Sequence, residues 1–352
     1  MGKSLSRLSL YFTNTKSIEI RQERVPPPGP GEVLIRSEFS AISAGTELLV
    51  YRHLISTQQP LDTVVPSLSG DFRYPVKYGY SVVGKIVDTG SEIDRSWMGK
   101  RIFTFHPHES LFPASLTELL EIPGDLPPLD ALFLPNMESA VNFIMDGRPS
   151  LGEKVIIFGQ GIVGLLTLRM LAQFPLKSLI TLDPLPLRRR ISQQSGAHLS
   201  LDPTSQGDLE KIVSILGDEN SSGADLTYEL SGNPEALNQA IAFTGFEGRV
   251  VVGSWYGSKP VHLTLDETFH RSRIKLISSQ VSTIASGFQG RWNKSRRFQT
   301  VWLMLEKIRP SQFISHQLPI TRAADAYRTL DENPGDMLQI IFTYPDAEED
   351  DV

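Results

Sequence analysis

The sequence contains no cysteine among its 352 residues. This absence excludes disulfide bonds, cysteine nucleophiles and every zinc site that is built from thiolates. It is consistent with a reducing compartment. A chain of this length typically folds into about two domains.

The sequence also lacks long apolar runs, and it has no excess of positive charge. The net charge is −6 at pH 7, which gives no electrostatic reason to bind nucleic acid or an anionic membrane surface. No stretch is long and apolar enough to cross a bilayer, and residues 1–30 hold no apolar run of signal-peptide length. We therefore expect a cytoplasmic protein.

The part of the chain before about residue 128 is rich in short β-prone runs. A stretch of Pro and Gly at 26–31 can only be a loop between two of them. Hairpins and a partly closed barrel are the natural way to bury such strands. The predicted strands are Leu8–Phe12, Ser17–Arg21, Glu32–Ser40, Ser81–Thr89 and Arg101–Phe105.

The pattern changes near Leu129, where a helix is predicted as far as Met145. Continuous apolar strands then alternate with amphipathic helices, which indicates a parallel sheet covered on both faces. We therefore predict an α/β protein with a doubly wound domain at 129–284 and a β-rich domain at 1–128, which residues 285–352 complete. The predicted strands are 155–158, 179–182, 226–229 and 248–253, and the helices between them end at Phe174 and Gln194 and begin at Pro234.

One glycine-rich segment predicts a dinucleotide site. Gly159-Gln160-Gly161-Ile162-Val163-Gly164 directly follows an apolar strand and directly precedes a helix, which is the context that the G-x-G-x-x-G motif requires. Gly159 permits a tight turn, Gly161 lets the backbone approach a pyrophosphate, and Gly164 allows close packing of the helix on the strand. The N–H groups at the start of the helix, at Ile162 and Val163, would bind the phosphate charge.

The residue that ends the next strand bears on the choice of cofactor. Asp183 can accept hydrogen bonds from the adenosine ribose and would repel a 2′-phosphate, which favours NAD. Arg188, Arg189 and Arg190 follow closely, and they suit either the 2′-phosphate of NADP or a solvated helix face.

The order of these features resembles the medium-chain dehydrogenase/reductase superfamily, the relatives of alcohol and sorbitol dehydrogenases, over nearly the full length. The matching motifs are Gly31-Glu32-Val33-Leu34-Ile35, Gly79-Tyr80-Ser81-Val82-Val83-Gly84, Gly99-Lys100-Arg101-Ile102, Ser231-Gly232-Asn233-Pro234 and Gly248-Arg249-Val250-Val251-Val252-Gly253. Three further segments are similar to the branch that contains bacteriochlorophyllide 3-hydroxyethyl dehydrogenase. They are 43–48, 135–140, and 279–282 with Arg291-Trp292.

The resemblance implies a GroES-like first domain, a Rossmann cofactor domain and a homodimer joined through the last cofactor-domain strands, near 274–282. It implies Ser231, Gly253 and Gln280 as further cofactor-binding residues. Ser254, Trp255 and Tyr256 follow a strand end and are candidates for lining the nicotinamide or substrate pocket, or form an ordinary aromatic loop.

The resemblance also locates the family's catalytic zinc ligands, and those positions carry Ala44, Tyr80 and Asn136 here, with Glu138 nearby. Alanine has no donor atom, and neutral tyrosine and asparagine are poor zinc ligands. We therefore expect no metal. A metal held by Glu47 and the His106-Pro107-His108-Glu109 segment is the alternative, although no complete ligand set stands at a recognisable spacing.

Hydride transfer without zinc still needs a group that polarises a carbonyl oxygen or accepts the alcohol proton. The resemblance points to Thr46 and Tyr80 as the first candidates. The candidates for passing the proton onward are Glu47, Tyr51, His53, His106 and His108. The purely structural alternatives are that Thr46 caps a helix, Glu47 sits in its first turn and Tyr80 packs in a core.

Three functions fit these features. The first is a zinc-independent, NAD(P)-dependent oxidoreductase that interconverts a secondary alcohol and a ketone on a small biosynthetic metabolite, with NAD preferred. The second is an NADPH-dependent reductase of quinones or activated double bonds, and the third is a dinucleotide-binding sensor or scaffold without catalysis.

Overall fold

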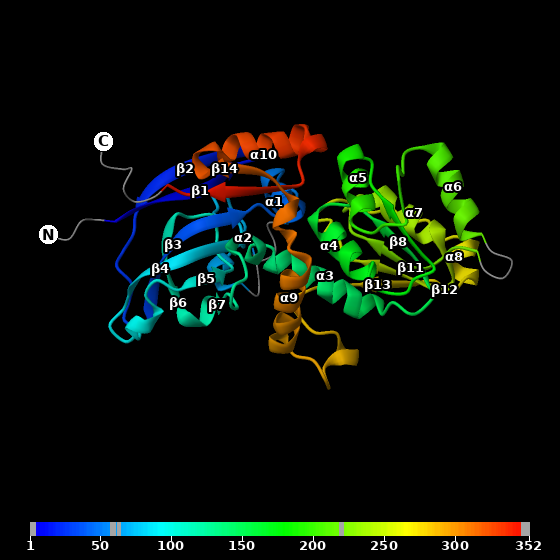
Figure 1. The fold of residues 1–352 in the computed structure, drawn as a ribbon. Helices are drawn as coiled ribbons and strands as arrows, with labels where there is room; N and C mark the ends of the chain where they lie inside the picture. The colour runs from blue at the N-terminus through cyan, green and yellow to red at the C-terminus, as the bar shows by residue number, and fades with distance from the viewer. Residues whose placement is uncertain (1–4, 57–60, 62–64, 218–221, 346–352) are drawn as a thin grey trace. The chain divides into compact units, whose positions relative to one another are not determined.

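The computed structural model describes residues 5–56, 61, 65–217 and 222–345. The chain forms two compact units, which are Met1–Pro135 with Arg309–Val352, and Asn136–Ile308 (Figure 1). Within the described ranges no helix is long and apolar enough to span a membrane.

The first unit is built on a mostly antiparallel sheet with short helices, in which β14 and β15 form a parallel pair. Its strand β3 bends the sheet, because one of its edges pairs first with β6 and then with β15, while its other edge pairs with β4. The strand order is β14-β15-β3-β4-β5-β7, and β1 and β2 form a separate hairpin. The bounds are β1 Ser6–Asn14, β2 Ser17–Arg24, β3 Glu32–Ala41, β4 Val82–Thr89, β5 Arg101–Thr104, β6 Leu111–Ser115, β7 Leu119–Glu121, β14 Ile314–Pro319 and β15 Gln339–Thr343, with helices α1 Ala44–Tyr51, α2 Pro128–Ala131 and α10 Ala323–Glu332.

The C-terminal strands and α10 complete the core of this unit. Phe342 of β15 and Tyr327 of α10 are fully buried with Phe12 of β1 and Val50 of α1 in one apolar cluster. This cluster underlies the start of α1, where several of the candidate residues stand. Each of the five strands predicted in this part of the chain is present, with ends shifted by a few residues.

The second unit is a doubly wound parallel sheet. Its strand order is β10-β9-β8-β11-β12-β13. The chain begins the sheet at β8, adds β9 and β10 on one side of it, and then adds β11, β12 and β13 on the other side. This is the order of a dinucleotide-binding Rossmann fold. The five pairings between neighbouring strands are all parallel. The bounds are β8 Lys154–Phe158, β9 Ser178–Leu182, β10 Leu199–Leu201, β11 Ala224–Glu229, β12 Thr244–Val252 and β13 Lys275–Ser278, with helices α3 Leu134–Gly147, α4 Ile162–Leu171, α5 Pro186–Gln194, α6 Gln206–Leu216, α7 Pro234–Phe243, α8 Glu267–Arg271 and α9 Lys294–Ile308 (Figure 1). The α/β fold class predicted from the alternating pattern is therefore confirmed.

The compact units end at other residues than the predicted domains. Residues 285–308, which were assigned to the β-rich domain, lie in the second unit. The reason is Arg297 of α9, whose guanidinium bonds to Glu138 and Asn142 of α3. That independently folding domains end at residues 128 and 285 remains a prediction.

Candidate active site

The glycine loop after β8 has the shape that its motif requires. Gly159 has φ +87°, and a Cβ there would lie 2.7 Å from the Cα of Ser231. A Cβ on Gly164 would lie 2.0 Å from the carbonyl oxygen of Gly159. Neither position can carry a side chain, so the loop packs directly against Ser231, just after β11, and the start of α4 packs directly against the loop.

Gly161 instead faces open space. A Cβ on it would meet only Nη1 of Arg188, at 3.9 Å, and Gly161 is the N-cap of α4. The first N–H groups of a helix have no intrahelical acceptor, so those of Ile162 and Val163 suit an anionic group at this open position. The loop therefore fits a pyrophosphate.

Asp183 lies at the end of β9, beside the loop, and is 2% exposed. Its Oδ2 accepts from the Gln160 N–H at 2.8 Å and its Oδ1 from the Leu185 N–H at 2.9 Å. Each carboxylate oxygen keeps a second lone pair. Asp183 thus ties the glycine loop to the start of α5 and can also accept from a ribose hydroxyl.

The three arginines differ in their surroundings. Nη1 of Arg188 lies 3.6 Å from Oδ2 of Asp183, and its buried Nε has no hydrogen-bond partner in the described part of the chain. Arg189 donates to the backbone oxygens of residues 183 and 184 and pairs with Asp202 at 3.0 Å. Arg190 is exposed. Arg188 is therefore the arginine with a buried, unused donor beside the loop.

A buried acid that was not predicted from the sequence lies at the carboxyl end of β11. Glu229 is fully buried, and its Oε1 accepts from the Ser231 N–H at 2.7 Å and the Gly232 N–H at 3.2 Å, while its Oε2 accepts from the Tyr256 hydroxyl at 2.5 Å. Burial and the Glu229 carboxylate raise the pKa of Tyr256 well above its ordinary value. A signal was present, because Glu229 is an acid at the carboxyl end of a strand of the parallel sheet, where such sheets bind their ligands.

Two other predicted cofactor residues lie at the same edge of the sheet. A Cβ on Gly253, just after β12, would lie 2.5 Å from a ring carbon of Phe143. Gln280 follows β13 and is exposed, and its side-chain amide donates to Oγ of Ser282 at 2.6 Å. The Ser282 N–H donates back to Gln280 Oε1 at 2.7 Å.

In the first unit the structure brings the two leading catalytic candidates together. The Tyr80 hydroxyl lies 3.2 Å from Oγ1 of Thr46 and donates to Oγ of Ser43. All three side chains are half-buried. Ser43 is the N-cap of α1 but makes no side-chain cap bond, so its hydroxyl remains available to Tyr80. Ser43 was missed as a candidate, although it begins the segment that resembles the family.

Glu47 supports this hydroxyl cluster of Ser43, Thr46 and Tyr80 from the interior. It is fully buried, and its Oε1 accepts from the Ser43 N–H at 2.7 Å. Its Oε2 accepts from the Tyr327 hydroxyl and lies 3.1 Å from Nε2 of His108. Burial and the carboxylate of Glu47 raise the pKa of Tyr327 well above its ordinary value. Glu47 does lie in the first turn of α1, but its contacts go well beyond favouring the helix dipole.

The polar chain continues inward from Glu47. Nδ1 of His108 lies 2.7 Å from Oγ of Ser40, which lies 2.7 Å from the Tyr344 hydroxyl. His108 is therefore the histidine that contacts a catalytic candidate.

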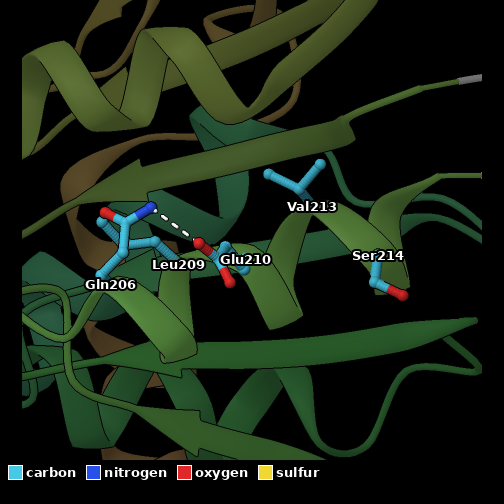
Figure 2. A pocket seen from close by; sticks show the side chains of 5 residues that line it. All are labelled: Gln206, Leu209, Glu210, Val213 and Ser214. Atoms are coloured by element: carbon cyan, nitrogen blue, oxygen red, sulfur yellow. Dashed lines mark hydrogen bonds between the residues drawn. The ribbon is translucent and has the colours of Figure 1, made fainter.

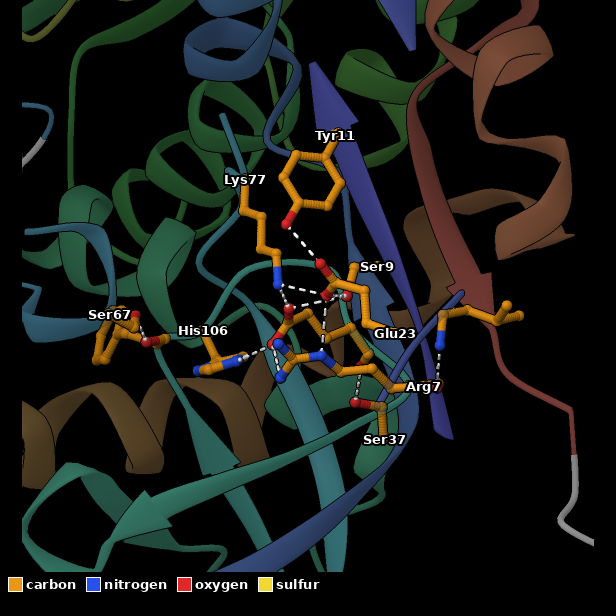
Figure 3. A network of polar contacts seen from close by, with 12 residues as sticks. Arg7, Ser9, Tyr11, Glu23, Ser37, Ser67, Lys77 and His106 are labelled. Atoms are coloured by element: carbon orange, nitrogen blue, oxygen red, sulfur yellow. Dashed lines mark hydrogen bonds and ion pairs between the residues drawn. The ribbon is translucent and has the colours of Figure 1, made fainter. Parts of the chain in front are cut away.

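The structure places His106 and His53 elsewhere. His106 stacks on Phe112 at 3.5 Å and lies 2.9 Å from Oε2 of Glu109, and burial lowers its pKa. It belongs to a network of charged residues at the β1–β2 hairpin (Figure 3). His53 lies just beyond the C-terminal end of α1 with φ +57° and packs edge-on against Phe72 and Tyr74.

The donor set does not fit the family's zinc. Ala44 has no donor, the Tyr80 hydroxyl is bonded within the hydroxyl cluster, and the carboxylate of Glu138 accepts from Arg297. In the described ranges no group of three or more His, Asp and Glu side chains could hold a metal ion.

A hollow of about 430 Å³ lies on α6 of the second unit. It is lined by Gln206, Leu209, Glu210, Val213 and Ser214, all on α6 (Figure 2). None of the cofactor or catalytic candidates contributes to it. Because one helix supplies its whole lining, it does not enclose a ligand.

Comparison with known proteins gives a consistent assignment. The family described as zinc-binding dehydrogenase matches residues 163–299. The uncharacterised zinc-type alcohol dehydrogenase-like protein YphC of Escherichia coli is 24% identical over 96% of this chain and 99% of its own length. The (R,R)-butanediol dehydrogenase of Bacillus subtilis is 23% identical over 71% of this chain and 78% of its own.

A solved structure shares the fold along the whole chain. An Escherichia coli alcohol dehydrogenase in complex with NADH superposes with a TM-score of 0.75 at 18% identity, over 96% of this chain and 99% of that one. Together with the Rossmann strand order and the glycine loop, these matches agree with the resemblance that the sequence motifs indicate. The chain is similar over most of its length to zinc-type alcohol dehydrogenase-like proteins, which confirms the predicted resemblance to the medium-chain dehydrogenase/reductase superfamily and the prediction of an NAD(P)-dependent oxidoreductase.

Proposed function

We propose that this protein interconverts a secondary alcohol and a ketone by hydride transfer with NAD(P), and that it does so without zinc. The observation that carries the proposal is the contact of Tyr80 with Ser43 and Thr46. It puts a cluster of hydroxyls where the resemblance locates zinc ligands. The bound dinucleotide would supply or accept the hydride.

The hydroxyl cluster can handle the proton that accompanies the hydride. In ketone reduction the Tyr80 phenol donates its proton to the carbonyl oxygen, and the hydroxyls of Ser43 and Thr46 stand within reach to relay a replacement proton from solvent to the phenolate. In alcohol oxidation the same groups take the proton away. Glu47 holds the backbone of Ser43 through its N–H, so it acts as a positioning residue for the cluster.

For the cofactor we propose a preference for NAD over NADP. Asp183 stands against the glycine loop with lone pairs that can accept from ribose hydroxyls, and its charge would repel a 2′-phosphate. Arg188, with its unused Nε, is the residue that would permit binding of NADP. The proposed binding residues are Gly159, Gly161, Ile162, Val163, Gly164, Asp183, Arg188, Ser231, Gly253 and Gln280.

The substrate class rests on relatives. Butanediol, which the Bacillus subtilis relative oxidises according to its name, is a secondary alcohol. Together with the segments similar to the bacteriochlorophyllide branch, this supports a hydroxylated or keto metabolite of biosynthesis as the substrate, acted on in the cytoplasm.

We also propose a homodimer. Strand β13 ends the sheet and, among the described strands, pairs only with β12, so its outer edge can pair with a second copy. Sedimentation analysis should give twice the chain mass of 39.2 kDa. A monomer at micromolar concentration would contradict this part of the proposal.

The deciding experiment follows deuterium from labelled NADH into products. The purified protein is titrated with NADH and NADPH by fluorescence and then incubated with a panel of ketones and enones. Deuterium on a carbinol carbon supports the proposal, whereas deuterium on the β-carbon of an enone assigns the protein to the double-bond reductases. Cofactor binding without any transfer across the panel indicates a sensor or scaffold.

A further inference from the structure

Three polar side chains line one face of α3 in the second unit. Glu138, Asn142 and Asp146 are spaced by four residues, so they lie above one another along the helix. The amide of Asn142 donates to Oγ of Ser279 and to Oδ2 of Asp146, both at 3.0 Å, and the Ser279 hydroxyl donates to the same Asp146 oxygen at 2.6 Å. This face of α3 therefore holds the chain where it leaves β13.

Arg297 of α9 holds the chain after β13 from the other side. Its Nε and Nη2 donate to Oε1 of Glu138 at 3.1 and 2.6 Å. Its Nη1 donates to Asn142 Oδ1 at 2.9 Å and to the carbonyl of Thr283 at 3.1 Å, and its Nη2 donates also to the carbonyl of Val281. Each of the three guanidinium nitrogens is used, and the side chain is fully buried.

Fold stability alone is a poor explanation for such a pair. Burying an arginine and a carboxylate carries a large desolvation cost, and apolar pairs of similar volume are often as stable. What an apolar pair could not do is donate to the carbonyls of residues 281 and 283. These carbonyls belong to a segment, 279–283, without helix or strand, whose path depends on such bonds.

The segment carries an ordered polar pair on its exposed side. Gln280 and Ser282 bond to each other through side chain and backbone, between the residues that the α3 face and Arg297 hold. Gln280 is exposed and is among the cofactor-binding residues proposed above.

We propose that the Glu138–Arg297 pair is a positioning device that fixes segment 279–283 and so presents Gln280 and Ser282 to the bound dinucleotide. The pair itself touches no reactant. This inference rests on the proposed function, because it assigns the segment to the cofactor.

The test is a double-mutant cycle read by NADH binding to the full-length protein. Q280A removes the presented amide, and R297M removes the donors that hold its segment. Each is expected to raise the Kd for NADH about tenfold, and the double variant should bind no more weakly than R297M, because coupled residues are not additive. Additive effects would overturn the inference.

Two further variants separate positioning from folding. E138M/R297M replaces the ion pair by apolar side chains, which should keep the melting temperature near that of the parent while leaving NADH affinity about tenfold lower. R249K alters a half-buried pair of the same unit, Arg249–Glu153 at 2.8 Å, that donates no hydrogen bond to 279–283, and it should leave the Kd unchanged. An E138M/R297M variant that binds NADH normally would refute the positioning role.

Failure of the proposed function gives a different result. If the parent protein does not bind NADH or NADPH, the cofactor assignment itself is wrong. If the parent binds NADH and all variants bind it equally well, only the positioning role is wrong.

Discussion

Nε2 of His108 lies 3.1 Å from Oε2 of Glu47, and both side chains are fully buried. The other carboxylate oxygen of Glu47 accepts from the N–H of Ser43. The hydroxyl cluster around Tyr80 is therefore anchored to a buried acid, which is itself anchored to a buried histidine.

Replacing Glu47 by Gln tests this anchor. Gln keeps the shape but turns one acceptor oxygen into a donor, so either the Ser43 N–H or the pair formed by His108 and Tyr327 loses its partner. We expect the free energy of unfolding to fall by about 1–3 kcal/mol and kcat to fall by at least about tenfold, because Ser43 is no longer held.

The control for E47Q is Y344F, which removes the far end of the same polar chain beyond Ser40. It should cost about 1 kcal/mol of stability and leave kcat unchanged. If E47Q and Y344F had equal kinetics, Glu47 would have no role beyond stability.

Tyr80→Phe removes the proposed proton donor and little else. We expect kcat to fall by about 10²–10⁴-fold, the usual contribution of a positioned acid, with the Kd for NADH unchanged. The matched control is Y74F, since Tyr74 also uses its hydroxyl within the first unit, to donate to the carbonyl of Val50. Activity of Y80F equal to that of Y74F would remove Tyr80 from the mechanism.

The features predicted well from the sequence are those set by neighbours in the chain. The strand 155–158, the glycine loop and the helix after it are consecutive, so their pattern contains the whole argument. Only the family resemblance indicated that Tyr80 and Thr46 lie close together, because 34 residues separate them in the sequence.

What could not be predicted depends on side chains that meet across the fold. His108 and Glu47 are 61 residues apart, and Arg297 and Glu138 are 159 apart. Sequence spacing could not tell which of His106 and His108 lies near Glu47. The two histidines flank Pro107 and differ only in the surroundings in which their side chains pack. Strand β10 was also missed, because Leu199–Leu201 is too short to give a pattern, and helix α6, which follows it, was not predicted either.

Arg188 is expected to set the tolerance for NADP. R188A should lower the affinity for NADPH about tenfold, through loss of a charge-assisted contact, and change the affinity for NADH by less than about threefold. R190A, on the same helix but exposed, should alter neither. A parent protein that binds NADPH more tightly than NADH would show that Asp183 does not govern the preference.

Metal analysis tests the zinc-free assignment. We expect far less than one zinc atom per chain in purified protein and no loss of turnover after treatment with a chelator, because Ala44 and Tyr80 replace a thiolate and an imidazole. Stoichiometric zinc that is lost together with activity would contradict this. Since tyrosine is a poor zinc ligand, Y80F separates the two cases, because it should lower kcat by about 10²–10⁴-fold without changing the metal content.

The charged network at the β1–β2 hairpin predicts a pH dependence of stability. Burial alone would raise the pKa of Glu109, but hydrogen bonds and charge from His106 and Lys77 lower it to about 2. Burial alone would also raise the pKa of Glu23. Hydrogen bonds from Lys77, Ser9 and Tyr11 outweigh burial and lower this pKa to about 2. Both carboxylates are therefore charged in the folded protein at pH values where those of the unfolded chain bind protons.

The sign follows from this difference in proton binding. Between about pH 5 and pH 2 the unfolded state binds more protons, so the free energy of unfolding falls as the pH is lowered through this window. Burial lowers the pKa of His106, which adds an effect of the same sign below about pH 6.5. Denaturant titrations of the parent should show this loss, and E109Q should be less stable at pH 7 and show a flatter pH dependence. E38Q, which breaks the exposed pair with Arg101, should follow the parent curve, because exposed ion pairs contribute little. A parent protein equally stable at pH 7 and pH 3 would show that the two carboxylates titrate normally.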